Sequence, residues 1–158
     1  MSSSELDLMA ASYLESLEKH EEFEGGILLG DSLHALPLDY SLESLDALDG
    51  LFIQASRIFV ADRMDLGDPE VQYLSFLAAF YVGEVLARAR GLRPTWKLYS
   101  EIAEGDPSFE RVFPYTFETY IVCCLGRDRF MPMVAIRHLL ELGESSPKRL
   151  RTSVAAFL

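Results

Sequence analysis

The chain has 158 residues, of which 49% are apolar and 25% are charged, and its net charge is −11. This length and balance predict one globular domain with its own hydrophobic core, and they exclude a largely disordered chain. No stretch reaches about 18 uninterrupted apolar residues, and no cationic start precedes an apolar segment at the N-terminus, so we expect neither a membrane span nor a signal peptide.

Residues 4–20 form the first predicted helix, because apolar side chains recur at helical spacing after a serine-rich start that offers N-caps. Gly25 and Gly26 predict its end. Residues 27–40 contain glycine and proline between short apolar pieces, which predicts a packed loop or a short helical turn. We expect this acidic first segment, residues 1–37, to lie at the periphery of the domain.

Residues 41–59 predict a second helix, with Ser41 as its N-cap. Its acidic residues, among them Asp46 and Asp49, fall away from the apolar stripe, which favours a solvent-exposed helix face over a cation site. Gly50 costs this helix roughly 1 kcal/mol relative to alanine, and we therefore expect a close contact with another helix there.

Residues 69–90 contain the longest nearly unbroken apolar segment and predict the central helix of the domain. Its broad apolar surface implies neighbours on more than one side. Glu84 lies among these apolar residues, and a buried carboxylate must be paired or hydrogen-bonded. Candidate partners are the indole N–H of Trp96, a backbone N–H in the strand region, and the guanidinium of Arg88. We expect Glu84 to be a structural anchor that ties this helix to the strand of Trp96; plain exposure and a functional role are the alternatives.

The rest of the chain predicts a sheet and a last helix. Residues 96–102 alternate large apolar with polar side chains, as a half-buried strand does, and residues 119–125 are β-branched and apolar, as in a central strand. A turn leads to a short strand at 129–130. A helix follows over 132–143, and the tail, 144–158, either docks as a short helix or is mobile.

The predicted fold class is therefore α+β in a single domain. N-terminal helices surround the central helix, a small antiparallel sheet follows, and a C-terminal helix completes the domain.

Three segments together resemble a group of uncharacterised bacterial domains: LDYSLESLDALDGL (38–51), FLAAFYVGEVLARARG (76–91) and a strand that begins at Trp96. A further strand–turn–strand follows, and then a proline before a helix, in RFMPMVAIRHLLELG (129–143). The resemblance implies a compact cytoplasmic α+β domain, often encoded beside secretion or toxin–immunity genes. It carries over no catalytic residues. In that group a glycine-rich link tends to precede the tryptophan, whereas residues 91–95 here are GLRPT.

The acidic excess lies entirely in the first third of the chain. Residues 1–50 hold 12 acidic residues and one basic residue, Lys19, whereas residues 51–158 hold 13 of each. Such a field repels phosphate backbones and favours basic partners. We expect no nucleic-acid binding, and two explanations stay open: the charge keeps the protein in solution, or it binds a partner with a basic surface. The candidate partner-binding residues are Glu18, Glu21, Glu22, Glu24, Asp46 and Asp49.

The sequence contains no nucleotide-binding or hydrolase motif, and its histidines lack metal-site spacing. His138 and Glu141 are three apart on the last predicted helix, but a helix surface explains them better than a metal. Cys123 and Cys124 are neighbours in an apolar strand, so at least one should face the core, and a reducing cytoplasm fits both. We expect no catalytic, cofactor or metal site.

These observations predict a non-enzymatic protein-binding module, in its most concrete form a cytoplasmic immunity protein that neutralises a cognate toxin. The alternative is an enzyme or small-ligand protein with an aromatic pocket between the central helix and the sheet. Association of copies through the apolar tail is compatible with either. The residues that would line the pocket are Trp96, Tyr99, Tyr115 and Tyr120.

Overall fold

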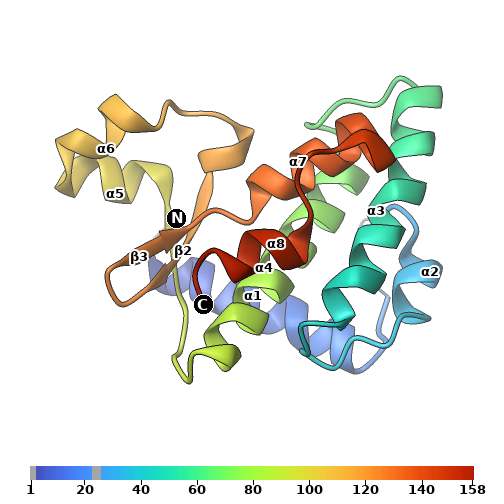
Figure 1. Cartoon of the computed structure of the whole chain (residues 1–158), viewed down its shortest axis with the longest axis horizontal. Helices are drawn as coiled ribbons and strands as arrows, with labels where there is room; N and C mark the ends of the chain where they lie inside the picture. Colours follow the sequence, from blue (N-terminus) through green and yellow to red (C-terminus); the bar gives the residue numbers. More distant parts are fainter. Residues whose placement is uncertain (1–2, 23–25) are drawn as a thin grey trace.

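The fold is a mostly helical α+β arrangement, as the sequence predicts (Figure 1). The computed structural model describes residues 3–22 and 26–158. In chain order the elements are α1 (Ser3–Glu18), α2 (Gly30–His34), α3 (Ser44–Ala61), α4 (Pro69–Ala89), β1 (Thr95–Leu98), α5 (Tyr99–Gly105), α6 (Pro107–Val112), η1 (Phe117–Thr119), β2 (Ile121–Leu125), β3 (Asp128–Phe130), α7 (Met133–Leu142), η2 (Gly143–Ser145) and α8 (Leu150–Ala155).

Helix α4 is the central packing element. Proline at its first position follows Asp68, whose backbone is extended, and Gly91 after its end adopts a left-handed φ of 65°. Most of its side chains from Val71 to Ala87 are buried. Helices α1, α7 and α8 contact it, and the ring of Trp96 reaches it from the sheet. The predicted broad burial of this helix is confirmed.

The sheet has the order β1-β2-β3 and is antiparallel throughout. Trp96 lies opposite Cys123, and Cys123 lies opposite Phe130, so these three side chains share one face. That face joins the main core with α4, whereas Val122 and Cys124 face a second, smaller cluster formed by α5 and α6. The sheet therefore separates two hydrophobic clusters.

The first predicted strand is only half right. Residues 95–98 form β1, but α5 begins at Tyr99. Tyr99, Ile102 and Ala103 follow the i, i+3, i+4 spacing of a helix and are buried together in the second cluster. A short run of alternating apolar residues is compatible with a strand or with a helix. Here the helix forms, because it buries these side chains together in the smaller cluster.

The N-terminal third departs from its prediction at the start of α3, which begins at Ser44, three residues after the predicted cap. The 27–40 stretch contains the short helix α2, in agreement with the predicted helical turn. Ser41 still caps α3, because its hydroxyl accepts a hydrogen bond from the Ser44 N–H at 3.1 Å. Gly25, expected to help end the first helix, lies outside the described residues.

The chain's tail docks on α3. Leu150 and Val154 of α8 are fully buried, and the Leu150 N–H donates to Asp49 Oδ1 at 3.0 Å. Arg151 pairs with Asp46 at 3.0 Å. The expectation that Asp49 lies on a solvent-exposed face is wrong, because it is only 7% exposed and supplies the acceptor for the first turn of α8.

The sheet approaches α4 closely at Gly83. A methyl group there would lie 2.7 Å from Cη2 of Trp96 and 3.1 Å from Cys123 Sγ. Gly50, expected to allow a close helix contact, is exposed, and a methyl group added to it would have nothing within 4 Å. The glycine that a close contact requires is therefore in α4.

We expect Gly83→Ala to destabilise the fold by about 1–3 kcal/mol, because the methyl group overlaps the Trp96 ring. Gly50→Ala is the matched control and should stabilise by about 0.5–1 kcal/mol, since it adds helix propensity in open space. Chemical denaturation of both variants measures this difference. Equal effects of the two substitutions would contradict the close packing at Gly83.

Asp49 predicts a pH dependence of stability. Burial raises the pKa of its carboxyl group, while the Leu150 N–H and Arg149 lower it less. Because the folded pKa lies above the unfolded value of about 3.9, this group's contribution is fully present below that value and is lost as pH rises through the folded pKa.

We therefore expect the stability of the wild type relative to Asp49→Asn to fall as pH rises from about 3 to 7, measured by chemical denaturation. Asparagine keeps the acceptor for the Leu150 N–H without the charge. Asp49→Ala removes the acceptor and should cost about 1–3 kcal/mol. A relative stability that rises with pH would mean that the carboxylate gains more from Leu150 and Arg149 than it loses by burial.

Candidate functional site

Histidine, cysteine, aspartate and glutamate side chains are the candidate metal ligands of the chain. Within residues 3–22 and 26–158, no group of three or more such side chains could hold a metal ion. His20 and His34 lie near each other, with ring centroids 5.4 Å apart, whereas His138 is half-buried on α7. No helix in the described part of the chain is long and apolar enough to span a membrane.

The two thiols lie in different surroundings, as the alternation of a strand requires. Cys123 is fully buried, and burial raises the pKa of its thiol. Cys124 is half-buried on the opposite face; burial also raises the pKa of its thiol, and Lys97 and Arg129 lower it less. A raised pKa disfavours the thiolate, so neither group is set up as a nucleophile.

The six acidic residues predicted to bind a partner do not form one surface. Asp46 and Asp49 are engaged with the tail, as described above. Glu18 accepts a hydrogen bond from the Tyr40 hydroxyl at 2.7 Å. Glu21 and Glu22 are exposed just beyond the end of α1, and Glu24 lies outside the described residues.

A carboxylate that sequence reasoning did not select joins this group. Asp31, in α2, is exposed and lines a hollow of about 240 Å³ together with Glu22 and His34. A neighbouring hollow of about 160 Å³ is lined by Glu18, His20, His34 and Tyr40. We refer to Glu18, Glu21, Glu22 and Asp31 as the acidic end of the molecule.

The acidic end can bind another protein, and the residues beside it are held in place by contacts within the fold. Glu21, Glu22 and Asp31 form no ion pair with any described residue. Beside them, the Tyr40 ring stacks on Tyr81 with centroids 4.9 Å apart, and the Tyr40 N–H donates to the Tyr81 hydroxyl at 2.8 Å. Exposed carboxylates in such a setting accept ion pairs from lysine and arginine.

A second surface is aromatic. Six rings contact one another in succession, with centroids 5.2–6.3 Å apart. Several rings are exposed, Tyr115 at 64% and Phe113 at 39%, and the adjoining Val112 is 67% exposed. Contiguous exposed apolar side chains of this size mark interaction surfaces. We call this set the aromatic row: Phe113, Phe109, Tyr99, Tyr115, Tyr120 and Phe76.

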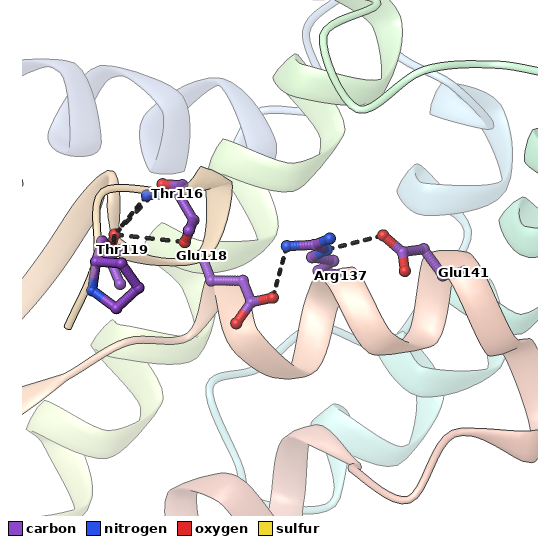
Figure 2. Close-up of polar contacts among 6 residues, drawn as sticks. Thr116, Glu118, Thr119, Arg137 and Glu141 are labelled. Carbon is purple, nitrogen blue, oxygen red and sulfur yellow. Dashed lines mark hydrogen bonds and ion pairs between the residues drawn. The ribbon is translucent and has the colours of Figure 1, made fainter. Parts of the chain in front are cut away.

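Polar contacts hold the backbone beside the aromatic row in place, as Figure 2 shows. The Thr119 hydroxyl donates to the Pro114 carbonyl at 2.8 Å and accepts from the Thr116 N–H at 3.0 Å. Arg137 of α7 then bridges Glu118 and Glu141, each at 2.8 Å. The row is thereby fixed to the body of the protein rather than carried on a free loop.

The four residues predicted to line an aromatic pocket do not line one cavity. Trp96 is buried in the main core, with its ring edge-to-face on Phe80 at 5.0 Å. Tyr99 belongs to the second cluster, on the other side of the sheet, and its hydroxyl donates to the Phe113 carbonyl at 2.8 Å. Tyr115 and Tyr120 lie at the surface.

Glu84 is not the anchor of the Trp96 strand. Its side chain is 23% exposed and pairs with Arg88 one turn along the same helix, at 3.1 Å. The Arg88 guanidinium in turn lies 3.7 Å from the centre of the Tyr40 ring. The strand is instead tied by Asp7 of α1, whose Oδ1 accepts from the Trp96 N–H at 2.7 Å.

Comparison with protein-family models, with curated proteins and with solved structures finds no match. The resemblance to bacterial domains beside toxin–immunity genes therefore stays a prediction, and the argument for function depends on the two surfaces themselves.

We expect Asp7→Ala to destabilise the protein by about 1–3 kcal/mol, because it leaves the outward-facing N–H of an edge strand without its acceptor. Glu84→Gln should cost only about 0.3–0.5 kcal/mol, the range of an i, i+4 pair on a helix. Urea denaturation of the two variants measures which one loses more free energy of unfolding. A larger loss from Glu84→Gln would restore that residue as the anchor.

Proposed function

We propose that this protein is a non-enzymatic binding module whose acidic end contacts a basic surface on a partner protein, and that it acts as an immunity protein against a toxin in its own cytoplasm. The observation that carries the proposal is the gathering, at one end of the fold, of exposed carboxylates that form no ion pair with a described residue: Glu21, Glu22 and Asp31.

Some acidic residues bind groups within the protein, whereas others remain exposed at the surface, and this division supports the proposed function. Asp7, Asp46 and Asp49 satisfy groups within the protein. Glu21, Glu22 and Asp31 form no ion pair with the described residues, so the fold does not use their charge for such a contact. Solubility alone requires a net charge but not its concentration at one end.

A field of this sign favours particular partners. It steers basic proteins into encounter and raises the association rate, with an effect that falls as salt rises. A toxin that attacks nucleic acid needs a basic surface to hold phosphate groups. An acidic protein can cover such a surface and block it.

The support beneath the acidic end favours tight recognition. Glu18 is held by Tyr40, which stacks on Tyr81, and the Tyr81 hydroxyl bonds Ser44 Oγ at 2.7 Å. A carboxylate that is held in place before binding, as Glu18 is, loses little conformational entropy on binding, so more of its interaction energy contributes to affinity.

To test this, the tagged chain is recovered from its native host at low salt, the retained protein is purified, and its dissociation constant is measured at about 50 and 300 mM salt. We expect weaker binding at the higher salt. Charge reversal of Glu21, Glu22 and Asp31 to lysine should weaken binding by about 10–100-fold. The retained protein, expressed alone, should arrest growth, and this chain should relieve the arrest.

The control makes the same change in net charge away from the acidic end, at three exposed acids that form no ion pair with a described residue. It should alter the affinity by less than about threefold. Affinity that ignores both salt and the position of the reversed charges would refute the electrostatic contact. Normal growth of cells expressing the retained protein alone would refute the immunity role. The control residues are Asp62, Glu104 and Glu110.

A further inference from the structure

We infer that two copies of this chain associate through the aromatic row, in a two-fold symmetric dimer that leaves both acidic ends free. The inference stands on the apolar and charged groups of α6 and the segment after it, and it is independent of the proposed toxin contact.

The exposed part of the row has the composition of an interface centre. Tyr115, Tyr120 and Phe113 present aromatic surface, and Val112 adds an aliphatic side chain. Aromatic side chains dominate the energetics of interfaces when they sit in a desolvated centre. The hydrogen bond from Tyr99 to the Phe113 carbonyl holds this surface in shape before association.

Charge complementarity makes a second copy the occupant of this surface. Glu110 and Arg111 are consecutive, exposed residues on α6 directly before Val112, and neither forms an ion pair with a described residue. A two-fold axis that stacks the rows brings Arg111 of each copy to Glu110 of the other. An interface of this symmetry repeats every contact, so one residue pair supplies two ion pairs.

The net charge of −11 does not oppose this arrangement. Ten of the twelve acidic residues in the first third lie between Glu15 and Asp49, with only one basic residue among them. Helix α2 lies at the opposite end of the molecule from α6, as Figure 1 shows. Residues 51–158, which include the row, carry no net charge. Charges farther apart than a Debye length of about 8 Å are largely screened at physiological salt.

The tail, which the sequence suggested for association, has most of its large apolar side chains packed on the body of the protein, and only Leu158 is largely exposed, at 60%. Leu150 and Val154 are fully buried, and Phe157 packs on Phe130 with ring centroids 5.1 Å apart. The aromatic row, by contrast, keeps Phe113, Tyr115 and Tyr120 exposed next to one another, and it is the part of the chain that a second copy would cover.

The test is sedimentation velocity of the full chain from about 1 to 500 µM, the range in which a small interface associates. We expect the sedimentation coefficient to rise from the monomer to the dimer value across this range. Tyr115→Glu should weaken the dimer at least tenfold, because it places a charge in the centre of the row. Circular dichroism checks that the variant folds. A chain that remains monomeric at every concentration would overturn the inference.

Matched controls place the same glutamate at exposed apolar positions outside the row. Leu142→Glu and Val60→Glu, at side chains 49% and 61% exposed, should leave the dimer unchanged. If they weaken it as much as Tyr115→Glu does, association occurs elsewhere and the inference is wrong.

Charge swaps test the symmetry directly. Glu110→Arg alone and Arg111→Glu alone should each weaken the dimer, because each places like charges across the axis. The double swap, Glu110→Arg with Arg111→Glu, should restore it, as should mixing the two single variants. Failure of the double swap to restore association would refute the two-fold arrangement, since its net charge equals that of the wild type.

Discussion

The ring of Trp96 occupies the space that a side chain at position 83 would need, and the sheet meets the central helix through this contact. Because Gly83 lacks a Cβ, β1 and β2 can approach α4 closely enough for Trp96 and Cys123 to join the main core. Asp7 completes the contact from the other side by accepting the strand's outward-facing N–H. Helix, strand and the first helix of the chain are thus joined at one place.

The position of the sheet on α4 determines what its other face can do. Val122 and Cys124 point away from the main core, and α5 and α6 cover them in a second cluster. This cluster is small, so the chain that follows it runs at the surface with Phe113 and Tyr115 exposed. The aromatic row therefore stays partly exposed because the two short helices that form the second cluster are too small to cover it.

The acidic first third divides in a similar way. Carboxylates that fall beside an unsatisfied N–H or a guanidinium become structural, as Asp49 does for the first turn of α8. Glu21 and Glu22, just beyond the end of α1, pair with no such group among the described residues and remain at the surface, where Glu22 and Asp31 share a hollow. The two surfaces lie at opposite ends of the molecule (Figure 1), so a partner on one leaves the other open.

Local sequence determined the helices and strands with a strong pattern: the burial of α4 by its apolar breadth, the central strand β2 by its β-branched run, and the end of α7 at Gly143. Tertiary structure decided which partner each polar group found. Asp49 and Asp46 lie on the same helix and look alike in sequence, yet only Asp49 is buried, because a tail 101 residues away docks on it. For Glu84 the predicted partner on its own helix, Arg88, is the one that pairs with it, and the predicted tie to the strand of Trp96 is wrong. Spacing along a helix predicts neighbours one turn away; it carries no information about which distant segment covers a face, and that depends on how the whole core closes.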